Sequence, residues 1–145
     1  MSLKTEWVRY GAEPYTGYFC YPERAQQPLP AIVVIQEAWG VDEHIEDVTR
    51  RFAQAGYAAL APDLFAQGGE RPVALTHARL AELQGFVNTM PPGAWSDADR
   101  RAKELATRPA DAVERIGESL GEMMSRVTNA PALLPALLAA TSWLR

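Results

Sequence analysis

A carboxylate and an indole follow an apolar run in the first half of the sequence. Glu37 and Trp39 come shortly after residues 31–35, and Asp63 comes shortly after a second apolar run, residues 57–61. Side chains of these types are costly as core material but are common in the wall of a pocket. They therefore indicate a binding pocket for a small molecule. On position alone, a solvated Glu37 and a Trp39 packed on the next helix explain these residues equally well.

The two apolar runs are predicted to be parallel strands. Residues 31–35 are uniformly apolar and mostly β-branched, which is typical of a central strand covered on both faces, and residues 57–61 predict another buried strand. Between them, the apolar residues of 41–55 recur at intervals of three and four, which predicts an amphipathic helix. A strand, a helix and a strand within about 30 residues form a βαβ unit with parallel strands. Because parallel strands end at the same edge of a sheet, we expect Glu37 and Asp63 to lie on one edge.

The remaining segments are predicted to complete an open α/β sheet. Residues 5–10 and 15–21 are rich in strand formers and are joined by turn-forming residues, so they predict an antiparallel pair at the start of the sheet. Helices are predicted over residues 73–87, over residues 96–105 with Ser96 as N-cap, along a stripe of Val113, Ile116, Leu120, Met124 and Val127, and over residues 132–144 against a sheet face. We expect a single α/β domain over residues 1–145. Since only two buried parallel strands are identified, we expect the sheet to be cut off.

The composition excludes several classes of partner. The chain has 14 basic and 18 acidic residues and a formal charge of −4, whereas a nucleic-acid binder needs a basic face. The longest apolar stretch, residues 130–140, contains two prolines and is too short to span a bilayer, and residues 1–11 lack the apolar core of a signal peptide. Cys20 is the single cysteine, so no internal disulfide is possible, which fits a reducing compartment. We therefore expect a cytoplasmic protein without nucleic-acid or membrane partners.

Several linked motifs occur in order around the βαβ unit. They are Q-E-x-[FW]-G-V at residues 36–41, an Ile-bearing helix, G-Y-A-A at residues 56–59 and P-D-L-[FY] at residues 62–65. Together they resemble the dienelactone hydrolase family, a branch of the α/β-hydrolases. The resemblance is strong over residues 30–65 and weak over residues 73–121, and the end of the chain is similar to the helix before the family's nucleophile. It implies an α/β-hydrolase-like fold and the hydrolysis of an ester or lactone of a small, anionic carboxylic acid.

The resemblance assigns roles to three residues of the first motif. Glu37 matches the active-site glutamate that holds the proton of the nucleophilic cysteine in the resting enzyme. The backbone N–H of Ala38 matches one of two donors of the oxyanion hole, and Trp39 would form a wall of the pocket. Arg71 and Arg79 follow the second strand and are candidates for binding a carboxylate of the substrate, although surface positions explain both arginines more simply.

Other residues that suggest a catalytic or metal site are better explained as structural. Residues 117–121 match a G-x-S-x-G elbow around Ser119, but the spacing before them suits a helix whose apolar stripe leaves Ser119 off the buried face. Cys20 lies in a predicted strand with no glycine elbow and no base nearby, so we expect a structural thiol. His44 and His77 lack further ligands at zinc spacing. We expect no metal and no other cofactor.

The predicted function is that of the N-terminal part of a dienelactone-hydrolase-like enzyme. Such an enzyme transfers the acyl group of an ester or lactone to a thiolate, stabilises the oxyanion and hydrolyses the thioester with water. The family's nucleophile, a cysteine in a G-x-C-x-G elbow, has no counterpart in the 145 residues, and neither do its later Asp and His. Two alternatives stay open. One is a non-catalytic remnant or binding module that self-associates through its sheet edge, and the other is a two-piece enzyme whose nucleophile arrives on another polypeptide.

Overall fold

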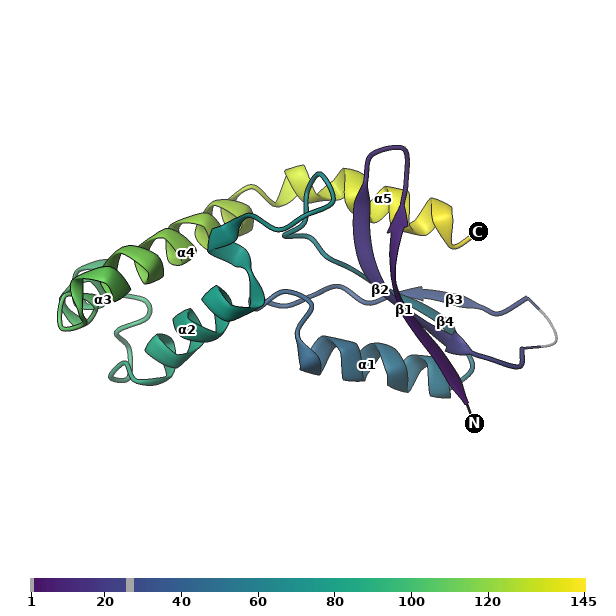
Figure 1. Cartoon of the computed structure of the whole chain (residues 1–145), viewed down its shortest axis with the longest axis horizontal. Coiled ribbons are helices and arrows are strands. Elements are labelled where there is room, and N and C mark those ends of the chain that lie inside the picture. The colour runs from purple at the N-terminus through teal and green to yellow at the C-terminus, as the bar shows by residue number, and fades with distance from the viewer. Residues whose placement is uncertain (1, 26–27) are drawn as a thin grey trace. The chain divides into compact units, whose positions relative to one another are not determined.

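The computed structural model describes residues 2–25 and 28–145, which divide into two units (Figure 1). The first, called the sheet unit below, consists of the described residues of Met1–Arg71 together with Asn129–Arg145. The second, called the helical unit, consists of Pro72–Thr128. Within the described ranges, no helix is long and apolar enough to cross a membrane.

The strands of the sheet unit form one mixed sheet. They are β1 (Leu3–Tyr10), β2 (Tyr15–Pro22), β3 (Ala31–Val33) and β4 (Ala58–Pro62), in the order β1-β2-β4-β3. β1 pairs antiparallel with β2, β2 pairs antiparallel with β4, and β3 pairs parallel with β4. The predicted antiparallel pair and the predicted parallel βαβ unit are confirmed, and the fold class is α/β.

Helix α1 (Glu43–Gln54) connects β3 to β4 and packs on the sheet. Asp42 is its N-cap, because the Asp42 side chain accepts a hydrogen bond from the Ile45 N–H at 3.0 Å. The buried residues of the helix are Ile45, Thr49 and Ala53. Gly56, with a φ of +97°, lies just after the helix in the left-handed conformation that commonly ends helices. The chain therefore turns at once into β4.

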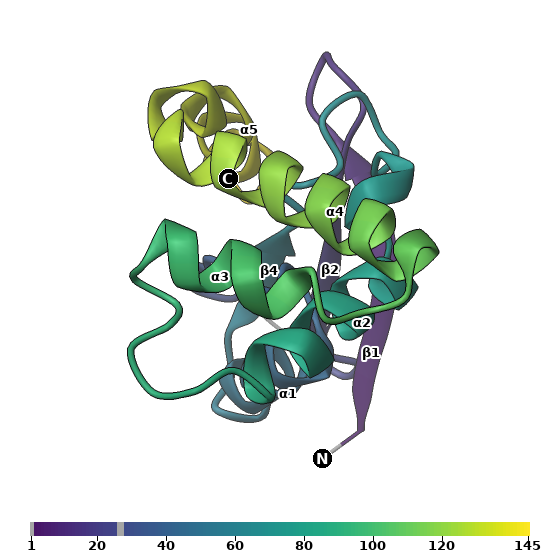
Figure 2. The ribbon, with the colours of Figure 1, turned by 90° about the vertical axis from the view of Figure 1, so that its left-hand side faces the viewer.

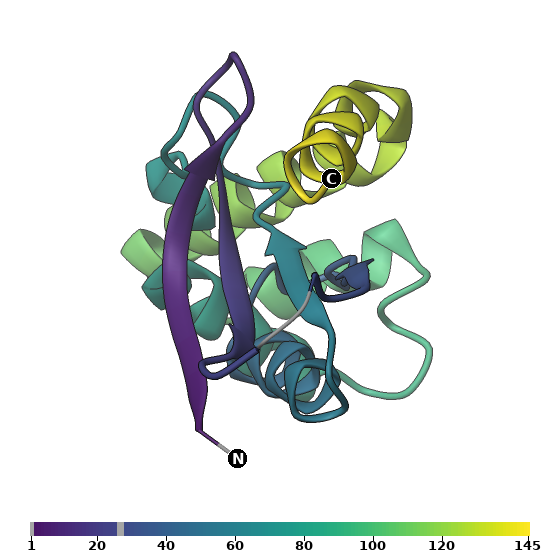
Figure 3. The same cartoon turned by 90° about the vertical axis from the view of Figure 1, so that its right-hand side faces the viewer.

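Helix α5 (Leu134–Trp143) covers the opposite face of the sheet from α1 (Figure 3). Ala140 of α5 packs with Leu60 of β4 in one buried cluster, whereas the next residue of the strand, Ala61, packs with Ile45 of α1 in another. Successive residues of a strand point to opposite faces, so the core continues on both sides of β4. The prediction that the last helix packs against a sheet face is confirmed.

The prediction for residues 31–35 is wrong in one respect. The run forms a strand, but β3 lies at the edge of the sheet with β4 as its neighbour, and it ends at Val33. The Val34 N–H still donates to the Leu60 carbonyl at 2.8 Å, and Ile35 is then 58% exposed. A uniformly apolar run predicts a strand, but its neighbours in the sheet decide whether that strand is central.

Helices build the helical unit (Figure 2). They are the short 3₁₀ helix η1 (Val73–Leu75) and the α-helices α2 (His77–Asn88), α3 (Ala98–Leu105) and α4 (Ala110–Thr128), while a further 3₁₀ helix, η2 (Ala130–Leu133), precedes α5 in the sheet unit. The helix predicted from residue 73 therefore starts only at His77. The cause is Thr76, whose backbone is extended (φ −62°, ψ 157°) and separates η1 from α2.

The N-cap of α3 is Asp97 rather than the predicted Ser96. The Asp97 carboxylate accepts hydrogen bonds from the N–H groups of Asp99 and Arg100 at 3.0 and 3.1 Å. Ser96 instead donates its hydroxyl to the Gly93 carbonyl at 3.1 Å. Both residue types are good N-caps. The predicted cap is therefore wrong by one residue, because the Asp97 carboxylate and not the Ser96 hydroxyl accepts the first N–H groups of the helix.

The buried face of α4 also differs from the predicted stripe. Its buried residues are Ile116, Ser119 and Met123. Met124 and Val127 of the predicted stripe are 39% and 56% exposed. The helix is rotated from the predicted orientation, and the Arg79 Nε of α2 donates a hydrogen bond to the Ser119 hydroxyl at 3.3 Å. Burying a hydroxyl costs much less free energy when it has a hydrogen-bond partner than when it has none. The apolar pattern of the sequence does not show this partner.

Two glycines give a direct test of the packing. A Cβ on Gly17 of β2 would lie 2.9 Å from the Ala61 carbonyl oxygen and 2.9 Å from a Leu60 methyl carbon. We expect Gly17→Ala to lower the free energy of unfolding by roughly 1–3 kcal/mol, as overpacking does. Gly121 is the matched control, since it lies inside α4 with no atom within 4 Å of its Cβ position.

Gly121→Ala is expected to raise the free energy of unfolding by about 0.5–1 kcal/mol, because alanine loses less conformational entropy in a helix. Urea titrations of both variants followed by circular dichroism measure the difference. A Gly17→Ala variant as stable as the original chain would contradict the close packing of β2 on β4.

Candidate active site

A tight turn follows β3 and carries three of the predicted site residues. Glu37 and Gly40 form an isolated antiparallel bridge, in which the Gly40 N–H donates to the Glu37 carbonyl at 3.3 Å. Ala38 and Trp39 occupy the two central positions of this segment, called the 37–40 turn below. The Glu37 and Ala38 residues are exposed, and Trp39 is half-buried. The Ala38 N–H donates to none of the described residues and is therefore available to a ligand.

The loop after β4 contains a buried ion pair. Asp63 Oδ2 accepts a hydrogen bond from Arg71 Nε at 2.6 Å, and the two side chains are only 5% and 7% exposed. The other carboxylate oxygen of Asp63 accepts the Phe65 N–H at 3.1 Å. The guanidinium of Arg71 also lies over the Phe65 ring, 5.8 Å from its centroid. The pair therefore joins the start of this loop, at Asp63, to its end, at Arg71.

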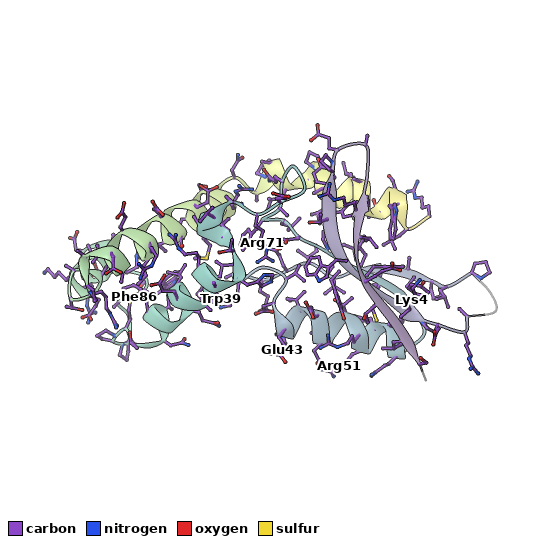
Figure 4. The ribbon with its side chains drawn as sticks, viewed as in Figure 1. Lys4, Trp39, Glu43, Arg51, Arg71 and Phe86 are labelled. Carbon is purple, nitrogen blue, oxygen red and sulfur yellow. The ribbon has the colours of Figure 1, made fainter. Side chains whose placement is uncertain are left out.

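Two hydrogen bonds tie this loop to the segment around the 37–40 turn. The Gln36 side-chain oxygen accepts the Leu64 N–H at 2.9 Å. Arg71 Nη2 donates to the Val41 carbonyl, although at a longer 3.4 Å. Trp39 and Arg71, labelled in Figure 4, belong to these two adjoining loops. The predicted meeting of Glu37 and Asp63 on one sheet edge thus takes the form of two cross-linked loops.

Gly40 permits the close approach of the two loops. Its φ is +81°, a conformation that favours glycine. A Cβ at this position would lie 3.0 Å from the Phe65 ring and 3.1 Å from Arg71 Nη2. Gln36 and Gly40 were not singled out as site residues from the sequence, although both belong to the motif Q-E-x-[FW]-G-V. Gln36 binds the loop after β4 through the Leu64 N–H, and Gly40 lets this loop approach the 37–40 turn closely.

A family model described as the dienelactone hydrolase family matches residues 15–129. The chain belongs to this family. Membership and the observed order of strands and helices confirm the α/β-hydrolase-like fold class, and the 37–40 turn follows β3 inside the matched region.

Individual relatives are similar to this chain over only part of their own length. A Yersinia pestis protein named "Putative carboxymethylenebutenolidase" is 43% identical over 76 residues, which are 48% of this chain and 28% of the relative. An Escherichia coli K12 protein of the same name is 45% identical over 54 residues, 37% of this chain and 20% of the relative. The chain thus spans about a quarter of the length of these curated relatives.

A solved structure is also similar to this chain over part of its own length. A Klebsiella pneumoniae protein whose crystal structure is named "Putative Dienelactone Hydrolase" is 30% identical, with a TM-score of 0.44. The match covers 77% of this chain and 47% of that one.

In this member of the dienelactone hydrolase family, the two candidate arginines lie in different units. Arg71 belongs to the sheet unit and is paired with Asp63. Arg79 belongs to α2 of the helical unit, where its Nη2 donates to the Arg115 carbonyl at 2.6 Å and to Glu118 at 2.8 Å. The Arg79 side chain is 15% exposed. Both guanidinium groups thus have protein partners, and a substrate carboxylate stays a predicted ligand for each.

Ser119 does not occupy a nucleophile elbow. It lies in the middle of α4, as the helical interpretation of residues 117–121 predicts, and its side chain is fully buried. Its expected place off the buried face is wrong, because the small hydroxyl packs inward and accepts a hydrogen bond from Arg79. A guanidinium stays protonated and is no general base. Ser119 therefore lacks the activation that a serine nucleophile needs.

Cys20 is a buried free thiol in β2. It belongs to the cluster that contains Ile45 and Ala61. Burial raises the pKa of the Cys20 thiol, and the Arg50 guanidinium acts weakly in the opposite direction. A reactive cysteine has a lowered pKa, so this thiol is structural. Among the described residues, no group of three His, Cys, Asp or Glu side chains could hold a metal ion.

The burial of Ser119 leads to a chemical prediction. We expect no stoichiometric adduct on Ser119 when the 145-residue chain is incubated with a fluorophosphonate, because Ser119 is buried and has no base. Intact-mass spectrometry measures the adduct, with an authentic serine hydrolase as the positive control. An adduct on Ser119 that disappears in Ser119→Ala would show that the serine is an activated nucleophile.

Proposed function

We propose that the chain forms one side of the active site of a dienelactone-hydrolase-type enzyme, which hydrolyses an ester or lactone of a small carboxylic acid. The observation that carries the proposal is the 37–40 turn at the carboxyl end of β3. It places an unpaired backbone N–H next to a carboxylate and an indole, at the edge where α/β proteins bind ligands.

The Ala38 N–H supplies one donor of the oxyanion hole. When a nucleophile adds to the carbonyl carbon of the substrate, negative charge develops on the carbonyl oxygen. The Gly40 N–H bond to Glu37 closes the turn, and the two hydrogen bonds to the loop after β4 hold the segment around it, which supports a donor that is in place before the substrate binds. Removal of one such donor typically costs about 2.7–4 kcal/mol of transition-state stabilisation.

In this proposal, Glu37 is the proton acceptor for the nucleophilic thiol. The exposed carboxylate accepts the thiol proton of the resting enzyme, and Trp39 forms a wall beside the acyl group. The thiolate adds to the acyl carbon, the C–O bond of the ester breaks, and the alcohol leaves with a proton. Water then hydrolyses the thioester, which releases the acid and regenerates the thiol.

The nucleophile itself lies outside the 145 residues in this proposal. Cys20 is the chain's one thiol and it is buried, and Ser119 has no base. A continuation of the chain, or a second polypeptide, would supply a cysteine in a G-x-C-x-G elbow. A small, anionic substrate acid fits Arg71 or Arg79, provided that its carboxylate competes with the present partners of the guanidinium. We also propose a cytoplasmic location, since no disulfide can form within the 145 residues.

A second candidate function is a non-catalytic module that self-associates. The observation that favours it is the open edge of β3, where Ile35 is 58% exposed. A hollow of about 400 Å³ runs along this edge, lined by Ala31, Ile32, Val33, Thr141, Leu144 and Arg145. An edge strand with apolar surroundings is able to pair with another chain.

A chimera tests the proposed function. We suggest joining residues 1–145 to the C-terminal remainder of the Yersinia pestis relative and measuring hydrolysis of an activated ester. Glu37→Gln should lower kcat roughly 10²-fold, because the amide keeps the shape and loses the proton acceptor. Glu43→Gln is the matched control, since Glu43 is an exposed glutamate on α1 and should leave kcat unchanged.

Two outcomes would oppose the proposal. Unchanged kcat together with a lowered melting temperature in Glu37→Gln would make Glu37 a structural residue. An inactive chimera, together with a concentration-dependent dimer of the 145-residue chain in sedimentation, would favour the self-associating module.

A further inference from the structure

The ion pair between Asp63 and Arg71 is almost completely buried, and the stability of the fold alone does not explain this burial. Both side chains are at least nine-tenths buried and their nearest atoms are 2.6 Å apart. Removing two charges from water is costly, so a buried pair is weak evidence for stabilisation. A guanidinium, however, presents its donors in one rigid plane and is able to hold two acceptors in a fixed relation.

Arg71 uses this plane to join two segments that are far apart in the sequence. Its Nε binds Asp63 at the end of β4, and its Nη2 reaches the Val41 carbonyl just after the 37–40 turn. The same Nη2 lies 3.1 Å from the place that a Gly40 Cβ would occupy. The guanidinium therefore packs directly against the last residue of the turn.

Asp63 in turn fixes Arg71. One oxygen of the carboxylate binds Arg71 and the other accepts the Phe65 N–H. The Phe65 ring is the second group against Gly40. Within the turn, the closing bond from the Gly40 N–H to the Glu37 carbonyl is a long one, 3.3 Å. The orientation of the turn thus depends strongly on what surrounds Gly40.

We propose that Arg71, held by Asp63, is a positioning residue that sets the orientation of the 37–40 turn and so aims the Ala38 N–H at the substrate carbonyl. This inference rests on the proposed function, and it gives Arg71 a role different from binding a substrate carboxylate. Arg71 acts through the turn and does not touch the reacting atoms. A misplacement of the turn by about 1 Å is enough to lower the rate on the order of 10²-fold.

The test compares nuclear magnetic resonance spectra of the ¹⁵N-labelled 145-residue chain and its variants. Arg71→Met should shift the amide resonances of residues 38–41 more than any other resonances outside the loop after β4. Arg115→Met is the control for the loss of a paired arginine, because it removes ion pairs with Glu82 and Asp111, both at 2.8 Å, from a more exposed site inside the helical unit. It should leave the resonances of residues 38–41 unchanged.

Arg71→Lys keeps the test valid if Arg71→Met does not fold. Its ammonium pairs with Asp63 as a point charge but does not hold the Val41 carbonyl in the same plane. We expect a smaller shift of the same resonances, with the rest of the sheet unchanged. Unshifted resonances of residues 38–41 in a folded variant, or equal shifts throughout the sheet, would overturn the positioning role.

A kinetic measurement separates this inference from the proposed function. In the chimera, Arg71→Lys should lower kcat at least tenfold with little change of KM, since a substrate-binding arginine would mainly raise KM. Shifted resonances with an unchanged kcat would uphold the positioning of the turn and refute its catalytic use. A raised KM with unshifted resonances would assign Arg71 to the substrate carboxylate instead.

Discussion

The buried pair between Asp63 and Arg71 is the interaction on which the candidate site depends. β3 and β4 run parallel, so the segments that leave them emerge at the same edge of the sheet. Parallel pairing alone leaves those segments free to diverge. Arg71 spans them by contacting Asp63 on one side and the Val41 carbonyl on the other. The segment around the 37–40 turn is therefore held to the loop after β4 by hydrogen bonds within the chain itself.

This constraint matters because backbone donors are effective only when they are already in place. An oxyanion hole stabilises charge without reorganisation, which is the main reason for its large effect on rate. Gly40 is the residue that makes the arrangement possible, since a side chain there would collide with the Phe65 ring and with Arg71. Ala38 is exposed and Trp39 is half-buried, which supports the proposed role of this turn in binding a ligand.

Local patterns predicted much of the fold correctly. The spacing of apolar residues over 41–55 identified α1, and the apolar residues 57–61 identified β4, because periodicity and strand composition are properties of neighbouring residues. The burial of Ser119 was missed, since it depends on Arg79, 40 residues away in the sequence. The edge position of β3 was missed for a similar reason, as it depends on which strands pair with it.

In the candidate site, too, the local motif was predicted and the contacts between distant residues were not. The motif placed Glu37 and Asp63 at strand ends, and the structure brings their loops together. The contacts of Arg71 with Asp63 and Val41 were not predicted, because a charged residue eight positions after Asp63 gives no local signal of the segment it bridges. Gly40 was part of the motif, but its contact with the Phe65 ring is visible only in three dimensions.

The contact between Gly40 and Phe65 offers the most direct measurement of the central claim, that the 37–40 turn is held in place by the loop after β4. The nuclear Overhauser effects of the 145-residue chain report it. The Gly40 Hα that takes the place of a Cβ should give a strong effect to the Phe65 ring protons and a resonance displaced by the ring current. The Leu64 amide proton, bound by the Gln36 side chain, should exchange slowly with solvent. Absence of the Gly40–Phe65 effect, together with rapid exchange of the Leu64 amide, would contradict a preformed turn.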